Sequence, residues 1–220
     1  MAFKRVVVTG LGALTPLGKT VADYWQGLTD GVSGCDFIKQ FDTTKFKTKF
    51  ACEVKDFEPT NYLDRKEARK IDRYCQFALI ASYEAVKDAG ISKENVDADR
   101  VGVIFASGIG GIITFQEEVI NFALGDGTPR FNPFFIPKMI LDIAAGQISM
   151  RYGFRGPNYA VVSACASSTN AIIDAFDNIR LGKADVIVTG GSEAVVIAAG
   201  VGGFNAMKAL SERNDSPQPA

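Results

Sequence analysis

Residues 101–111, VGVIFASGIGG, decide the fold class. The first six contain no polar side chain, so both faces of the strand that they predict are apolar. Such a strand lies in the middle of a sheet that is covered on both faces, which is typical of α/β layering and not of a sandwich. The glycine-rich stretch at residues 107–111 predicts a turn directly after the strand.

Further strands and helices alternate along the chain at the spacing of β-α units. Runs rich in β-branched residues predict three more strands, at residues 5–9, 159–162 and 186–189. Apolar residues at helical spacing predict helices at residues 21–28, 64–89, 115–124, 139–152 and 169–181. We therefore expect a largely parallel sheet covered by helices, interrupted by a polar surface excursion at residues 33–60.

Composition limits the classes of function. The 220 residues are 47% hydrophobic and carry a net charge of −1, which excludes a disordered or collagen-like chain. A balanced charge gives no global attraction to nucleic acid or to anionic lipid, so we expect neither as a partner. No signal-peptide stretch and no run of about 18 apolar residues is present, so the sequence predicts a cytoplasmic protein without a membrane span.

The four cysteines, Cys35, Cys52, Cys75 and Cys165, form no C-x-x-C pair, and histidine is absent. In a reducing compartment this pattern favours free thiols over a disulfide framework or a zinc site, and we expect no metal. Without histidine the chain lacks the usual general base and the usual partner of a nucleophilic Ser or Cys. Either the protein is not a conventional acyl-transfer enzyme or the chain is only part of one.

Cys165 is the strongest candidate for chemistry. It follows an expected strand and precedes an expected helix, so its sulfur should face the free N–H groups at the start of that helix, where a thiolate and a developing oxyanion are both stabilised. Small neighbours in SACASS, residues 163–168, allow a sharp turn and the approach of a thioester. The alternative is a buried cysteine that packs as a small hydrophobe, as we expect for Cys75.

Two other features have competing explanations. Glycines 108, 110 and 111 could bind a phosphate or give freedom beside a pocket, whereas GLGALT at residues 10–15 lacks the third glycine of a dinucleotide site. Five cations, Arg65, Lys66, Arg69, Lys70 and Arg73, share one side of the helix expected at residues 64–89. They form either a solvated helix face or, together with Arg130, a dock for an acidic partner.

Seven motifs occur together and in order. They are VVVTGLGALTPLG at residues 6–18, SGIGG at 107–111, NPFFIP at 132–137, YGFRGP at 152–157, SACASS at 163–168, TGGSEA at 189–194 and GVGGFNAMKALS at 200–211. In this series the sequence resembles the β-ketoacyl-acyl-carrier-protein synthases, specifically the elongating enzymes of type II fatty acid synthesis. The resemblance implies an α/β, thiolase-like fold, of which residues 1–220 are the first of two βαβαβ-type halves, with a mixed, mostly parallel five-stranded sheet covered by helices on both faces.

The resemblance also implies roles for particular residues. Cys165 takes the position of the acyl-accepting nucleophile, Ile109 and Phe204 match positions of the acyl pocket, and Phe134 matches one contributed across a homodimer interface. Residues near the region that meets acidic acyl-carrier protein are Arg65, Lys66, Arg69, Lys70 and Arg130. The family's two catalytic histidines, a supporting lysine and a gating phenylalanine belong to its second half, which explains the missing histidines.

The implied reaction is a decarboxylating condensation of an acyl chain on Cys165 with malonyl-carrier protein. No cofactor is implied, because the substrates arrive on the phosphopantetheine arm of the carrier protein. Two alternatives remain: a non-catalytic partner of the chain-length-factor kind, against which Cys165 argues, and a thiolase-like acyltransferase that uses coenzyme A. The cations and the FFIP segment at residues 134–137 disfavour the second.

Overall fold

The structure, a computed structural model, describes residues 3–217 and divides them into two compact units. The first, here called the sheet unit, contains residues 3–12 and Pro59–Ala194. The second, here called the ribbon unit, contains Ala13–Glu58 and residues 195–217.

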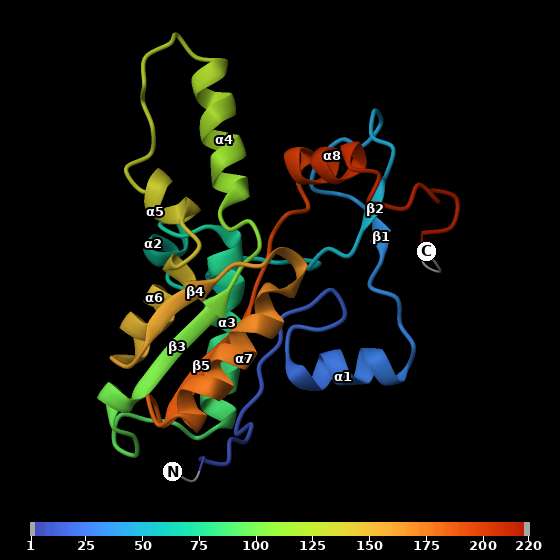
Figure 1. Ribbon diagram of the computed structural model, residues 1–220. Coiled ribbons are helices and arrows are strands. Elements are labelled where there is room, and N and C mark those ends of the chain that lie inside the picture. The colour runs from blue at the N-terminus through green and yellow to red at the C-terminus, as the bar shows by residue number, and fades with distance from the viewer. Residues whose placement is uncertain (1–2, 218–220) are drawn as a thin grey trace. The chain divides into compact units, whose positions relative to one another are not determined.

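The sheet unit is built around three parallel strands (Figure 1). The central strand β3, Val101–Ala106, lies between β4, Asn158–Val161, and β5, Val186–Gly191. Val103 pairs with Asn158 on one side and with Val188 on the other, so the three carboxyl ends lie at one edge of the sheet. Every residue of β3 is buried, as its lack of polar side chains predicts.

Alternate side chains of β3 enter two separate cores. Val101, Val103 and Phe105 pack with residues of α3, Arg73–Asp88, and α6, Ile143–Tyr152. Ile104 and Ala106 face the opposite side, where they pack against α7, Ser167–Arg180. Figure 1 shows α7 on one face of the sheet and α3 on the other. The α/β class with helices on both faces is therefore confirmed.

The remaining elements of the sheet unit connect these layers. They are the 3-10 turns η1, Pro59–Asn61, η2, Ala98–Arg100, and η3, Ala164–Ala166, and the helices α2, Arg65–Ala68, α4, Ile112–Ala123, and α5, Phe135–Met139. In the described residues, no helix is long and apolar enough to cross a membrane.

The ribbon unit contains α1, Val21–Thr29, the antiparallel pair β1, Asp36–Phe37, and β2, Phe50–Ala51, and α8, Ala198–Ala206. Thr20 and Asp23 have the three-residue spacing that predicts an N-terminal cap, and α1 has this cap, because the Thr20 hydroxyl oxygen accepts from the Asp23 amide at 3.1 Å. Thr48 holds α8 beside the ribbon: its amide donates to Asn205 Oδ1 and its hydroxyl accepts from Asn205 Nδ2, at 3.3 and 2.8 Å.

The strand expected at residues 5–9 is wrong, and so is the count of five strands in one sheet. Residues 5–9 are not a strand, and Val7 and Val8 are 63% and 78% exposed. The local pattern resembles a strand, but a ladder also needs a neighbouring strand, and within residues 3–217 no strand pairs with this segment. The following Gly12 lies against α3, where a Cβ would be 1.9 Å from the Ala81 carbonyl oxygen.

The single helix expected at residues 64–89 is also wrong, because the chain forms α2 and α3 with a break at residues 69–72. Asp72 causes the break by capping α3, since its carboxylate accepts from the Tyr74 amide. The same buried carboxylate accepts from the amide and hydroxyl of Thr114 at 2.9 and 2.6 Å. The helical spacing of the five cations therefore does not place them on one helix face.

A candidate active site at the carboxyl edge of the sheet

Three turns meet at the carboxyl edge of the parallel sheet. They follow β3 at residues 107–111, β4 at residues 162–166 and β5 at residues 192–194. This edge is where α/β proteins place their ligands, because the loops gather there and helices begin with free N–H groups. Cys165, Ile109 and Glu193 come from the three turns.

The turn that carries Cys165 is held by its own hydrogen bonds. The buried Ser167 hydroxyl donates to the Ala164 carbonyl oxygen at 2.6 Å and accepts from the Ser163 amide at 2.8 Å. Asn170 Nδ2 donates to the Ser163 hydroxyl at 2.7 Å. Ala164 has a φ of 52°, a backbone conformation that costs a non-glycine residue of order 1–3 kcal/mol. The turn thus holds a strained conformation directly before the cysteine.

Cys165 itself is exposed and lies two residues before the first residue of α7. No side chain caps that end of the helix. The 14-residue helix therefore directs its first N–H groups and its positive dipole end toward the cysteine turn. The position between a strand and a helix is as the sequence predicts, and it suits a nucleophile whose product carries an oxyanion.

Glu193 fixes the neighbouring turn. Its Oε2 atom accepts from the amides of Gly108 and Ile109 at 2.7 and 3.0 Å, and its Oε1 atom accepts from the buried Ser107 hydroxyl at 3.0 Å. The Ser107 oxygen in turn accepts from the Gly110 amide. One carboxylate therefore sets the backbone that presents Ile109.

The two turns approach each other at Gly108. A Cβ atom at this position would lie 2.9 Å from Glu193 Oε2 and 3.4 Å from the Ala164 carbonyl oxygen. A side chain at position 108 would displace the Glu193 carboxylate, which gives a packing reason for one of the glycines for which the sequence leaves phosphate binding and freedom beside a pocket as alternatives. Gly108 also brings the Ile109 turn against the turn of Cys165.

Phe134 and Lys70 lie together, away from these turns in the sequence. Phe134 immediately precedes α5 and is 38% exposed, and Lys70 Nζ lies 5.5 Å from the centre of its ring. Near Phe134 in the chain, the rings of Phe115, Phe131 and Phe135 stack between α4 and α5. Further apolar side chains of this region are exposed, among them Val119, Ile120, Phe122, Leu124 and Ile136. The α4–α5 region thus presents a large apolar surface.

The predicted basic residues do not form one stripe, and all are exposed except Arg73, which begins α3 and is half-buried. Arg65 and Lys66 belong to α2, whereas Arg69 and Lys70 follow its end. Arg130 lies between α4 and α5 and pairs with Asp126 at 3.1 Å. Phe204 belongs to α8 in the ribbon unit and is half-buried there.

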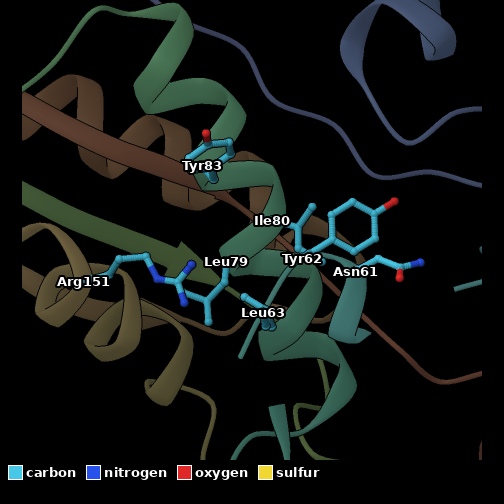
Figure 2. A pocket seen from close by; sticks show the side chains of 7 residues that line it. All are labelled: Asn61, Tyr62, Leu63, Leu79, Ile80, Tyr83 and Arg151. Atoms are coloured by element: carbon cyan, nitrogen blue, oxygen red, sulfur yellow. The ribbon is translucent and has the colours of Figure 1, made fainter. Parts of the chain in front are cut away.

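A separate cavity of about 380 Å³ lies between α3, α6 and residues 61–63 (Figure 2). Leu63, Leu79 and Tyr83 are among its lining residues, together with Arg151, which pairs with Glu67. None of the residues that the sequence singles out lines this cavity, and it offers no thiol or carboxylate. We therefore place the candidate site at the sheet edge and not in this cavity.

Sequence reasoning missed Glu193 and Ser107 as parts of the site. Both belong to the motifs TGGSEA and SGIGG of the sequence, where Ser107 follows β3 directly and Glu193 lies two residues after β5. Polar residues just past the ends of adjacent parallel strands converge at one edge, so this placement is the signal that could have found them.

Comparisons with known proteins agree with this geometry. Residues 3–219 match the model of the family described as "Beta-ketoacyl synthase, N-terminal domain". The chain is 45% identical over 214 residues to 3-oxoacyl-acyl-carrier-protein synthase 2 of Synechocystis sp., covering 97% of this chain and 51% of that relative. It therefore spans about half the length of the curated relative.

Solved structures show the same fold. The ishigamide ketosynthase/chain length factor matches with a TM-score of 0.88 at 27% identity, covering 96% of this chain and 52% of that one. A type II polyketide ketosynthase, solved in complex with its acyl-carrier protein, matches with a TM-score of 0.82 at 29% identity, covering 96% and 51%. The thiolase-like architecture expected from the sequence is confirmed.

Proposed function

Because this chain belongs to the β-ketoacyl synthase family, we propose that it is the nucleophile-bearing half of a 3-oxoacyl-acyl-carrier-protein synthase that elongates fatty acids. The observation that carries the proposal is the position of the exposed Cys165. It lies in a strained turn that is held by its own hydrogen bonds, directly before α7, whose N-terminus has no side-chain cap. A cytoplasmic location accords with this function.

In the first step the Cys165 thiolate attacks the thioester carbonyl of an acyl-carrier protein. A tetrahedral oxyanion forms, and its negative charge is stabilised by N–H groups of the turn and of the start of α7. The intermediate collapses to an acyl-Cys165 thioester, and the phosphopantetheine thiolate leaves and takes up a proton. Ile109, presented by the turn that Glu193 holds, contacts the acyl chain and limits its length.

In the second step malonyl-carrier protein loses CO2, and the resulting enolate attacks the acyl-Cys165 carbonyl. The bond to sulfur breaks, and 3-oxoacyl-carrier protein is released. Decarboxylation needs hydrogen-bond donors for the enolate, which the family takes from histidines. Since these 220 residues contain none, we assign this step to a second half of the protein.

The acyl-carrier protein is the proposed macromolecular partner. Arg65, Lys66, Arg69 and Lys70 are exposed cations that can meet acidic residues, and a structural relative is a complex with a carrier protein. A second copy of the protein is the proposed cover for the apolar α4–α5 region, with Phe134 at that interface. No cofactor is proposed, because the substrates carry the phosphopantetheine.

The function is tested by comparing two acyl donors and measuring the mass of the protein after each reaction. The protein is mixed with acyl-carrier protein or with the same acyl chain on coenzyme A, and its intact mass is measured. We expect rapid addition of one acyl group from the carrier protein and slow addition from coenzyme A. Faster addition from coenzyme A would instead support a thiolase-like acyltransferase, and no addition from either donor would support a non-catalytic chain-length partner.

A further inference from the structure

Two cysteines of the ribbon unit face each other across its two strands. In the register of β1 and β2, Asp36 lies opposite Ala51 and Phe37 lies opposite Phe50. The next pair along the ribbon is Cys35 and Cys52, each directly next to a paired residue. The sequence, which contains no C-x-x-C, gives no sign of this pair, because the cysteines are brought together by strand pairing.

The hydrogen-bond pattern shows which type of pair this is. The Ile38 amide donates to the Lys49 carbonyl oxygen at 3.0 Å, beside the opposed residues Phe37 and Phe50, which are therefore a non-hydrogen-bonded pair. Pairs alternate along an antiparallel ladder, which makes Cys35 and Cys52 a non-hydrogen-bonded pair. The Cα atoms of such a pair are about 4.5 Å apart, within the range of about 4.4–6.8 Å that a disulfide spans.

The two thiols are free and already in contact. The Cys35 and Cys52 side chains form a hydrogen bond, and burial, then the neighbouring Cys52, raise the pKa of the Cys35 thiol. Cys52 is exposed and Cys35 is half-buried. Of the charged groups nearby, Asp36 also raises the pKa of Cys35, while Lys55 and Lys39 lie 3.5 and 4.0 Å from the Asp36 carboxylate. Because Cys52 is exposed and Cys35 is half-buried, the thiol of Cys52 is the more accessible of the two.

We propose that Cys35 and Cys52 form a reversible disulfide by exchange with a low-molecular-weight disulfide such as oxidised glutathione. The Cys52 thiolate attacks one glutathione sulfur, which forms a mixed disulfide and releases one glutathione thiolate. The Cys35 thiolate then attacks the Cys52 sulfur, which forms the Cys35–Cys52 bond and releases the second glutathione. Two protein thiols are oxidised, and one glutathione disulfide is reduced to two thiols.

The location gives the disulfide a structural consequence. Cys52 directly follows β2, and Thr48, two residues before β2, bonds Asn205 of α8 through its amide and its hydroxyl. Lys49 is joined to the same region, since its amide donates to Asn214 Oδ1 at 2.9 Å. A covalent link across the ribbon stiffens the segment on which α8 rests, and α8 carries Phe204.

Thiol trapping tests the proposal directly. The purified protein is incubated with oxidised glutathione, quenched with N-ethylmaleimide under denaturing conditions, and digested with trypsin for mass spectrometry. We expect loss of maleimide labelling at both Cys35 and Cys52. We also expect a linked pair of their peptides, whose mass is the sum of the two thiol peptides less two hydrogen atoms. Dithiothreitol should restore labelling at both positions.

Single variants provide the matched control. In Cys35→Ser, glutathione should stay on Cys52 as a stable mixed disulfide, because the resolving thiol is gone; in Cys52→Ser, modification should be slower, because Cys35 is less accessible. Three results for the unaltered protein would overturn the proposal: unchanged labelling at both cysteines, stable glutathione on Cys52 beside a free Cys35, or a link only between two chains on a non-reducing gel. The readout does not depend on acyl transfer.

Discussion

Cys165 and Cys75 belong to the same unit, yet their surroundings differ completely. Cys75 lies on α3, is fully buried against the sheet, and burial raises the pKa of its thiol to about 12. Cys165 is exposed in a strained turn at the sheet edge, at the start of α7. Since both side chains are chemically identical, the difference teaches that burial and exposure separate a core cysteine from a candidate nucleophile.

The largest effect is expected from replacing the exposed cysteine. Cys165→Ser leaves a hydroxyl where the thiolate acts, so acyl transfer from the carrier protein should fall by at least about a thousand-fold. The rate is measured by quenching the reaction at timed points and determining the acylated fraction of the protein from its intact mass. Because the side chain is exposed, the melting temperature should hardly change.

Cys75→Ala is the matched control for that comparison. It should retain acyl transfer while costing about 1–2 kcal/mol of stability, because a buried thiol is removed. Equal loss of acyl transfer in the two variants would remove the distinction between the two cysteines.

The next effect concerns Glu193, which we expect to be a positioning residue. Glu193→Ala frees three hydrogen-bond donors of the neighbouring turn, at Ser107, Gly108 and Ile109, and should lower the acylation rate by about a hundred-fold through misplacement of the site. Glu193→Gln keeps an acceptor and should recover much of the rate.

The acylation rate and the melting temperature together show whether Glu193 positions the site or only stabilises the fold. The exposed Glu117 of α4 provides a control, since Glu117→Ala should leave the acylation rate unchanged. If Glu193→Ala lowers the melting temperature yet keeps the acylation rate of folded protein, the carboxylate serves stability alone.

A third effect tests the reach of the site beyond Cys165. Ile109→Phe enlarges an exposed side chain on the turn beside Cys165. The acylation rate with long acyl chains should therefore fall by about ten-fold relative to the rate with short ones. The ratio of acylation rates for a short and a long acyl-carrier protein measures this. An unchanged ratio would place the acyl chain away from this turn.

The smallest effect concerns the buried Cys75 and the free energy of unfolding at alkaline pH. Below the ordinary thiol pKa of 9.0, Cys75 is neutral in both the folded and the unfolded protein. Between pH 9.0 and about 12 only the unfolded thiol ionises, so the free energy of unfolding should fall with rising pH, by up to about 1.4 kcal/mol per unit.

Urea denaturation between pH 8 and 11 compares the protein with Cys75→Ala. The variant should show a shallower fall, because it lacks the Cys75 thiol and, with it, one of the groups that raise the pKa of the neighbouring Tyr74, which burial raises first of all. Parallel curves would mean that Cys75 is not kept neutral by burial.

The sequence predicts those parts of the fold whose signals are local. The apolar run of β3, the small-residue turn at Cys165 and the Thr20 cap of α1 each depend on a few adjacent residues, and the structure contains all three. Cys75 is likewise in the core, as its place on the apolar side of the expected helix predicts.

The errors occur where distant residues decide. Residues 5–9 have the composition of a strand but pair with no strand among the described residues. The helix expected at residues 64–89 breaks at Asp72, which caps α3 and whose carboxylate also accepts from Thr114, 42 positions away. The Glu193 contacts to residues 107–109 and the opposed Cys35 and Cys52 also depend on pairing between segments far apart in sequence. Local periodicity contains no information on such contacts.

The most direct test of the central claim is to locate the acyl group after a single turnover with acyl-carrier protein. The protein is quenched in acid and digested with trypsin, which releases residues 156–180 as one peptide that contains Cys165. The account predicts the acyl mass on that peptide alone, removable by neutral hydroxylamine as expected for a thioester. Acyl mass on any other peptide, or on residues 156–180 in the Cys165→Ser variant at the same rate, would contradict it.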